Sequence, residues 1–410
     1  MNIPKLRFKE FTDEWKIKKL DKSTYIKARV GWKNLKASEY VSSGIPMIAG
    51  QHIKQGKILW DKVDFITNER YDESPEIQLK NNDIIFSKDG SLGNPAIIKN
   101  MPKKATINGT MMLIRLNYIN DNVSPNYFYQ ICNSQYFKKM VSLIKSGGTV
   151  PHIFQRDIIN FTFPIPKTLE EQEKIANFLS IVDKKIENLK NTITSLENQK
   201  KGLLQQIFSQ KLRFKDENGN NYPNWEKKKL EDIGSFSRGG NLSKSDLSKK
   251  GTSCILYGEL YTYYNEFATE IKSKTLNTTN LVLSKKYDVL LPLSGETAED
   301  ISTCTCIFFD DIALGSDLLI FRSSFFDGRF MSLLLKYKYK YKIAQIAQGK
   351  SIVHISEKNI KNINIKIPCI EEQQNIADFI LIFTKKLENQ KAQLKHWKQI
   401  KKGLLQQMFI

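Results

Sequence analysis

The sequence predicts an α/β (α+β) fold in which two globular domains stand in tandem, joined by two long antiparallel coiled-coil helices. Three observations predict it: an internal repeat, a heptad pattern at the end of each repeat, and short apolar runs bounded by turn residues. We expect globular domains over residues 1–169 and 210–370, and helices over residues 170–209 and 371–410. The two halves are then related by a pseudo-two-fold axis.

The internal repeat is clearest at the end of each half. Lys200–Gln206 and Lys401–Gln407 both read Lys-Lys-Gly-Leu-Leu-Gln-Gln, and Glu-Glu-Gln begins at both Glu170 and Glu371. A unit of about 200 residues is too long for a solenoid repeat. The sequence therefore indicates a duplicated domain.

Each repeat closes on an apolar pattern with alternating steps of four and three residues and no proline, which is typical of a coiled-coil seam. The first seam consists of Ile175, Leu179, Val182, Ile186, Leu189, Ile193 and Leu196. The second consists of Ile376, Ile380, Phe383, Leu387, Leu394 and Trp397, with Gln390 in place of an apolar residue between Leu387 and Leu394. At 1.5 Å per residue each helix would reach roughly 55–60 Å. An apolar stripe this narrow cannot be buried by one helix alone, so each helix needs a partner helix. The simplest partner is the corresponding helix of the other repeat.

The order of the segments predicts the direction of the helices. The first helix ends where the second globular domain begins, so a second helix packed along it must run back toward the first domain. The pair is then antiparallel. Leu-Arg-Phe-Lys, which begins at both Leu6 and Leu212, also implies that the two chain ends lie close together. We therefore expect circular permutation to be tolerated.

Lys200 and Lys401 interrupt the two seams at the same repeat position. Their ammonium groups could snorkel to solvent, fix the register of the helices, or meet an acidic partner protein. The sequence favours snorkelling and register.

The globular domains contain signals for both strands and helices. Residues 44–49 and 83–86 are short apolar runs typical of strands. Residues 124–144 are expected to form a helix with Pro125 in its first turn. Residues 336–342 alternate lysine and tyrosine as a strand would, but the repeat aligns them with that helix, so we predict a helix.

The charge balance favours an anionic partner. The chain has 63 Lys and Arg against 43 Asp and Glu, a net charge of +20, and most of the excess lies in the globular domains. Nucleic acid is the first candidate and a membrane surface the second. Two cationic domains separated by a stiff spacer suit a linear polyanion, so double-stranded DNA is expected.

Other sequence features narrow the class of protein. No apolar run approaches the roughly 18–20 residues that cross a bilayer, and the N-terminus lacks the apolar region of a secretory signal. The five cysteines are odd in number and scattered, which suits reduced thiols. We expect a cytoplasmic protein without a membrane span or a metal site.

Motifs for catalysis are missing from the sequence. It has no Gly-x-x-x-x-Gly-Lys-Ser/Thr phosphate loop, no Gly-x-Ser-x-Gly elbow and no Asn-Pro-Pro-Tyr/Phe loop of an amino-methyltransferase. Gly90-Ser-Leu-Gly93 has the wrong spacing for a dinucleotide fingerprint. We therefore expect no catalytic site and no cofactor in this chain.

The strongest candidates for DNA contact are two corresponding loops, residues 147–156 and 349–358. Their glycines allow close approach to a phosphate, and their polar side chains can donate to phosphates or base edges. The candidate residues are Thr149, His152, Gln155 and Arg156 in the first loop and Lys350, Ser351, His354 and Lys358 in the second. Alternatively, both histidines are hydrogen-bonded core residues that close a strand.

Further candidates for DNA contact lie outside these loops. They are Lys88 and Ser91 after a predicted strand, Lys145, Lys338 and Lys342 on predicted helices, and Arg238 beside two glycines. The alternatives are an ordinary hairpin turn, a solvated helix face, and a core or loop role.

Two divergent domains, each followed by a helix with a Glu-Glu-Gln start and a Lys-Gly-Leu-Leu-Gln-Gln end, resemble the specificity subunit of type I restriction–modification enzymes. The resemblance covers essentially the whole chain. It implies that each globular domain reads one half of a bipartite DNA target. It also implies that the helices set the spacer and dock two modification (methyltransferase) subunits.

The same resemblance places the chemistry in partner subunits. The modification subunits would bring S-adenosylmethionine for adenine methylation, and restriction/translocase subunits would use ATP and Mg²⁺. Three alternatives remain open: the specificity module of a type IIB/IIG-like restriction system, a non-catalytic duplicated coiled-coil scaffold that binds other proteins, and a stand-alone nuclease or methyltransferase.

Overall fold

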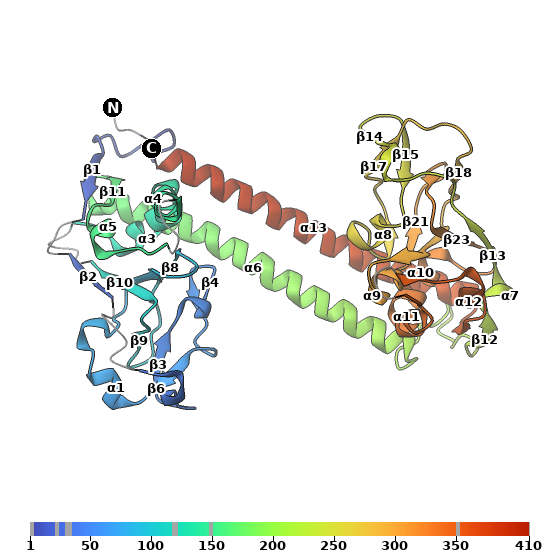
Figure 1. The fold of residues 1–410 in the computed structure, drawn as a ribbon, viewed down its shortest axis with the longest axis horizontal. Helices are drawn as coiled ribbons and strands as arrows, with labels where there is room; N and C mark the ends of the chain where they lie inside the picture. Colours follow the sequence, from blue (N-terminus) through green and yellow to red (C-terminus); the bar gives the residue numbers. More distant parts are fainter. Residues whose placement is uncertain are drawn as a thin grey trace. The chain divides into compact units, whose positions relative to one another are not determined.

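The computed structural model describes residues 4–20, 24–28, 35–116, 122–146, 151–349 and 353–409. The chain forms two compact units: Met1–Lys190 with Ala392–Ile410, and Asn191–Lys391. Both divisions fall inside the long helices, α6 (Leu169–Phe208) and α13 (Ile370–Met408), shown in green and red in Figure 1. Each unit therefore contains one globular body and a segment of each long helix.

The globular body of the first unit is built on two main sheets, besides two sheets of only two strands each. The larger one has the order β2-β10-β7-β8 with antiparallel neighbours, and the smaller one has the order β6-β3-β9. Their strands are β2 (Tyr25–Ala28), β10 (Met111–Arg115), β7 (Ile84–Ser87), β8 (Gly93–Ile97), β6 (Asp64–Ile66), β3 (Ile45–Ile48) and β9 (Thr106–Ile107). Ile84 and Phe86 share a core with the helix α3 (Pro125–Asn133), whereas Ile85 packs in the core of the smaller sheet. This alternation places both faces of β7 in apolar surroundings.

The second unit repeats this plan with larger sheets. One has the order β13-β23-β19-β21-β16 and the other β14-β17-β15-β22-β18. The first contains β13 (Ser235–Arg238), β23 (Leu318–Arg322), β19 (Val289–Pro292), β21 (Thr305–Ile307) and β16 (Phe267–Ala268). The second contains β14 (Leu247–Ser248), β17 (Ser273–Thr275), β15 (Thr252–Ile255), β22 (Ala313–Leu314) and β18 (Val282–Leu283). Val289 and Leu291 face one core and Leu290 faces the other, as in β7.

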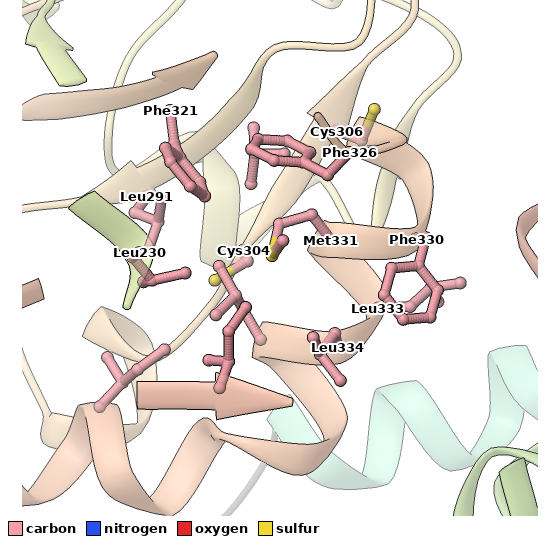
Figure 2. Packing of buried hydrophobic residues seen from close by; sticks show 14 of the residues in the cluster. Leu230, Leu291, Cys304, Cys306, Phe321, Phe326, Phe330, Met331, Leu333 and Leu334 are labelled. Atoms are coloured by element: carbon pink, nitrogen blue, oxygen red, sulfur yellow. The ribbon is translucent and has the colours of Figure 1, made fainter. Parts of the chain in front are cut away.

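The main core of the second unit contains two of the cysteines. Figure 2 shows Cys304 and Cys306 among phenylalanine, leucine and methionine side chains, including Phe321 and Met331. Burial raises the pKa of the Cys304 thiol to about 12, so this thiol stays protonated at neutral pH. Within the described residues no group of His, Cys, Asp and Glu is suited to hold a metal ion. None of the described helices has the length and apolar character to cross a bilayer.

Two predicted helices contain interruptions. The helix expected over residues 124–144 is divided into α3 and α4 (Gln135–Ser146), because Ser134 is extended and its hydroxyl donates to the Ile131 carbonyl and accepts the Tyr136 N–H. Residues 336–342 are helical except at Tyr339, as the repeat alignment predicts. They divide between the π-helical turn η5 (Leu334–Lys338) and α11 (Lys340–Gln345).

The repeated Glu-Glu-Gln motif has a structural role in both units. Glu171 accepts two hydrogen bonds from the Arg7 guanidinium, at 2.7 and 2.8 Å, and Glu372 accepts two from Arg213, at 3.1 and 2.6 Å. The indole of Trp15 also donates to Glu171 at 3.0 Å. Both carboxylates are buried, which explains why Glu-Glu-Gln and Leu-Arg-Phe-Lys recur together.

The glutamine of each motif attaches the long helix to its globular body. The amide oxygen of Gln172 accepts the Ser124 N–H at 2.8 Å, and that of Gln373 accepts the Asp327 N–H at 3.0 Å. Ser124 and Asp327 are the N-caps of α3 and of α10 (Gly328–Leu333), respectively. The start of each long helix is therefore hydrogen-bonded to the start of a core helix.

The end of each long helix meets a Leu-Arg-Phe-Lys segment. The Leu212 N–H donates to the Gln206 carbonyl at 3.1 Å, and the Leu6 N–H donates to the Gln407 carbonyl at 3.0 Å. In the second unit this segment follows the helix in sequence, whereas in the first unit it comes from the opposite end of the chain. The N-terminal segment thus lies beside the end of α13, as the repeat predicts.

Within each unit the two long helices run antiparallel. In the first unit Ile175 and Leu179 share a core with Leu405 and Met408. Ion pairs join Asp183 to Lys401 in the first unit and Glu197 to Lys391 in the second. The buried residues of the seams are Ile175, Leu179, Val182, Ile186, Leu189, Ile193, Leu196, Ile376, Ile380 and Leu387. Phe383, Leu394 and Trp397 are half-buried.

The two lysines that interrupt the seams have different environments. Lys200 is buried, and its ammonium contacts the Glu266 carboxylate and donates to the Thr384 hydroxyl at 2.8 Å. Snorkelling is therefore the wrong interpretation for Lys200. Lys401 is half-buried and pairs with Asp183 at 2.5 Å.

Candidate nucleic-acid interface

In each unit the end of a buried central strand meets a histidine-containing segment. The Ile153 N–H donates to the Lys88 carbonyl at 2.9 Å, just beyond the end of β7. In the second unit the Ile355 N–H donates to the Leu293 carbonyl at 3.0 Å, just beyond β19. The fold thus brings together two predicted segments that lie about 60 residues apart in the sequence, and it does so twice.

In the first unit the Asp89 carboxylate links the two segments of this junction. This carboxylate contacts the imidazole Nδ1 of His152 and lies 3.0 Å from the Lys88 ammonium. Burial by itself raises the pKa of Asp89, but the bonds from Lys88 and His152 outweigh it and leave this pKa below its ordinary value. The carboxylate is therefore ionised at neutral pH and holds both neighbours in place.

The two predicted contact residues of the turn after β7 have different environments. Lys88 is buried and its charge is already paired with Asp89, so it is not a free ammonium for a phosphate. Ser91 is exposed in the turn. The turn requires Gly90, whose φ is +66° and which lets the chain reverse into β8.

The segment that follows His152 presents three exposed side chains: Phe154, Gln155 and Arg156. The Gln155 amide donates to the Ile26 carbonyl at 2.8 Å, which fastens the segment to β2. The Arg156 guanidinium lies 4.8 Å from the centroid of the Phe154 ring. The histidine loop therefore presents an aromatic ring beside a cation.

In the second unit a serine occupies the place of Asp89. The Ser294 hydroxyl donates to the Asp317 carboxylate at 2.8 Å and lies 2.9 Å from Nδ1 of His354. The short strands β20 (Ser294–Gly295) and β24 (Val353–His354) pair antiparallel here, with Ser294 opposite His354. His354 is exposed, so the core role considered for this histidine is wrong.

A pocket of about 310 Å³ opens beside this serine–histidine pair. Its polar lining consists of Arg238, Ser294, Asp317, Gln348, His354, Ser356 and Asn359. The Arg238 guanidinium lies 3.5 Å from the Glu357 carboxylate, whose pKa is lowered by Lys361 and also by Arg238. The pocket offers hydrogen-bond donors and acceptors together, as recognition of a base edge requires.

The remaining predicted contacts lie on helices or outside the described residues. Lys338 donates to the Phe208 carbonyl at 2.6 Å and lies over the Trp225 ring, so it caps α6 and is not a phosphate-facing residue. Lys342 is exposed and donates to the Asn364 carbonyl at 3.4 Å. Lys145 on α4 and Lys358 on α12 (Glu357–Lys361) are exposed. Thr149, Lys350 and Ser351 lie outside the described residues.

Sequence reasoning missed four residues of the junctions: Asp89, Phe154, Ser294 and Asp317. Asp89 stands next to a predicted contact, and the repeat aligns it with Ser294, so comparing the two halves could have found it. Asp317 lies in the turn just before β23, and no local pattern points to it.

Comparison with known proteins identifies the family. The model of the type I restriction modification DNA specificity domain matches residues 13–198 and 222–396. The type I restriction enzyme MjaVIII specificity subunit of Methanocaldococcus jannaschii is 25% identical over 213 residues, which cover 51% of this chain and 49% of that protein. The chain thus matches about half the length of this relative. The putative MjaX specificity subunit of the same organism is 23% identical over 419 residues, 98% of this chain and 95% of that protein.

Solved structures show the same fold. The S subunit of the type I restriction–modification system from M. genitalium has a TM-score of 0.63 at 16% identity, covering 100% of this chain and 99% of that chain. A chain from a study of complex assembly and conformational transition of the type I R-M system has a TM-score of 0.50 at 16% identity, covering 89% and 90%.

Proposed function

Because this chain belongs to the type I restriction modification DNA specificity family, we propose that it is the DNA-recognition subunit of such a system. Each globular unit reads one half of a bipartite target. The observation that carries this proposal is the junction of strand end and histidine segment, built twice with different side chains. The two junctions share one backbone arrangement but carry different side chains, and this suits two half-sites of different sequence.

The exposed residues of the junctions have the chemistry to read bases and hold phosphates. Arg156 in the first unit and Arg238 in the second can each make two hydrogen bonds to a guanine. Ser91, Lys145 and Lys358 are exposed donors suited to phosphate oxygens.

Substituting one arginine at a time tests this assignment. We expect Arg156→Ala to weaken discrimination at one half-site by about 1–3 kcal/mol, or roughly 5- to 150-fold, and to leave the other half-site unchanged. Arg238→Ala is the matched control and should affect the other half-site. The measurement is methylome sequencing of a host that carries each variant with its partner subunits. A continuous motif, or the absence of any motif, contradicts bipartite recognition and favours the scaffold alternative.

We propose that this chain carries no catalytic group and acts in the cytoplasm with partner subunits. Two modification subunits supply S-adenosylmethionine and methylate adenine, and restriction/translocase subunits supply the ATP- and Mg²⁺-dependent steps. No proposed role requires a cofactor on this chain.

A repeated apolar patch on the long helices supports two copies of one partner. Ile181 on α6 and Ile382 on α13 occupy the same position of the repeat and are 67% and 69% exposed. Beside them, Phe178 and Phe379 each contact a phenylalanine of a Leu-Arg-Phe-Lys segment, at centroid distances of 5.8 and 5.5 Å. Such exposed residues in duplicate suit a partner that binds twice.

Charging either isoleucine should remove one partner. We expect Ile181→Asp and Ile382→Asp each to lower the stoichiometry from two modification subunits to one, and the double variant to bind none. Loss of an apolar contact of this size weakens binding by about 1.5–3 kcal/mol, and the buried charge adds to this. Native mass spectrometry of the assembly measures the ratio. Leu276→Asp, at an equally exposed leucine outside the helices, is the control. Two bound subunits in the double variant would place the docking surface elsewhere.

A further inference from the structure

Phe154 breaks a local rule of helix formation. It is the N-cap of α5 (Gln155–Ile159), makes no side-chain capping bond, and is 48% exposed. In the corresponding place of the second unit, Ser356 caps α12 by accepting the Asn359 N–H at 3.3 Å. Serine is a preferred cap and phenylalanine is not, so neither helix formation nor burial explains Phe154.

The surrounding residues hold the Phe154 ring in one place. The imidazole of His152 lies 4.4 Å away between centroids at 50°, and the Arg156 guanidinium lies 4.8 Å from the ring centroid. His152 is itself held by Asp89. The Phe154 N–H donates to the Asp157 carboxylate at 2.8 Å, which fixes the backbone. A ring oriented in this way loses little conformational entropy when it binds.

The charges around the ring identify the kind of ligand. Arg156 is exposed and makes only a marginal contact, at 4.0 Å, with the Asp157 carboxylate, which already accepts the Phe154 N–H. A purely apolar partner would have to desolvate this cation, whereas a nucleic acid presents phosphates to the cation and base faces to the ring. The arrangement therefore favours DNA over an apolar protein surface.

We propose that Phe154 acts as a wedge that enters a base step of the half-site read by the first unit and partly unstacks it. Arg156 then lies against the neighbouring phosphate or base edge. Apolar side chains that enter a base step kink the duplex and add deformability to sequence recognition. Because Ser356 stands in this place in the second unit, only one half-site is wedged. This inference rests on the proposed DNA recognition.

Permanganate footprinting tests the wedge, because permanganate oxidises unstacked thymines. The full chain, assembled with its partner subunits, selects duplexes from a random pool, and these duplexes serve as probes. With the wild-type chain we expect reactive thymines at one step of the first half-site and none in the second. Phe154→Ala should abolish this reactivity and weaken binding about 5- to 100-fold, as loss of a stacked base does.

Two variants separate the wedge from a general defect. Phe154→Trp keeps an aromatic face and should retain the reactive step. Phe325→Ala removes a 72% exposed phenylalanine of the second unit and should change neither binding nor reactivity. Thermal unfolding of Phe154→Ala should match the wild type, since the ring is exposed.

The outcomes are distinct. Wild-type complexes without a reactive step, or Phe154→Ala complexes that keep it, overturn the wedge even where DNA selection succeeds. If Phe154→Ala weakens binding but the wild type leaves every thymine stacked, the ring contacts a thymine methyl in an intact duplex, and the wedge is again overturned. If the wild-type chain selects no bipartite sequence at all, the proposed function fails instead.

Discussion

Adding seven residues to both long helices, after Lys190 in α6 and after Lys391 in α13, should widen the gap of the methylated target by about three base pairs. Both helices run from one compact unit into the other, and these are the points where the units divide. Seven residues add about 10.5 Å of helix at 1.5 Å each, against 3.4 Å per base pair. They also preserve the heptad phase of the seam. The bases of each half-site should not change, because neither junction is altered.

Methylome sequencing of a host carrying the lengthened chain and its partners measures the gap directly. A seven-residue insertion in α6 alone is the control, since it puts the two seams out of register and should abolish modification. An unchanged gap in the doubly lengthened chain would show that the helices do not act as the ruler.

Replacing Lys200 by alanine should destabilise the second unit by about 3–5 kcal/mol, because it leaves a buried carboxylate without its closest cation. Glu266 is buried and contacts Lys200, while the Tyr337 hydroxyl donates to it at 3.1 Å and the Lys336 ammonium lies 3.9 Å away. The Tyr337 hydroxyl and the Lys336 ammonium compensate only in part for the loss of the Lys200 ammonium. The Thr384 hydroxyl of α13 also loses its donor, so the link between α6, α13 and the globular body is broken.

Hydrogen exchange monitored by mass spectrometry distinguishes this effect by unit. Protection should fall in the second unit, around β16 and the start of α13, and stay unchanged in the first. Lys401→Ala is the matched control at the same repeat position. Its ion pair with Asp183 is partly exposed, so its loss should cost less than about 1 kcal/mol. Replacing Glu266 by glutamine in the Lys200→Ala chain should restore part of the stability. Equal losses from Lys200→Ala and Lys401→Ala would contradict the special role of the buried pair.

The same cluster predicts a dependence on pH. Burial by itself raises the pKa of Glu266, but Lys200 and Lys336 outweigh it, so the folded-state pKa lies below the ordinary value of 4.5. Since the folded state favours the ionised carboxylate, this stabilisation is present above pH 4.5 and is lost as the pH falls through the folded-state pKa. Lys200→Ala removes the group that does most to lower the Glu266 pKa. It should therefore raise the midpoint pH of acid unfolding of the second unit.

Patterns confined to one helix were readable in the sequence. The heptads, the repeated Glu-Glu-Gln start and the order of segments predicted two long antiparallel helices, because helical periodicity is encoded by neighbouring residues. Comparing the two halves also resolved the ambiguous run at 336–342 in favour of a helix. The interruption at Ser134 was not predictable in the same way, because a single side-chain hydrogen bond to the backbone decides it.

Candidate contact residues were harder to judge from sequence. The sequence does not distinguish a lysine whose ammonium is free from one whose ammonium is paired. In the structure Lys88 pairs with Asp89, and Lys338 donates to the carbonyl at the end of α6. The histidine loops were predicted as segments that contact DNA, and this stays a prediction, whereas their contact with the strand ends is a finding of the structure. The two aspartates of the junctions were not predicted, because Asp89, which contacts His152, and Asp317, which accepts from Ser294, lie in turns far from the loops in the sequence.

By itself the sequence determined the duplication, the two long helices, their direction and the cationic character of the globular bodies. These properties follow from composition and from spacing along the chain. Only the tertiary structure decided which charges are buried, which histidine has an acidic partner, and that Phe154 stands exposed beside an imidazole and a guanidinium. These facts depend on contacts between residues that lie far apart in the sequence, and a pattern along the chain does not encode such contacts in a readable form.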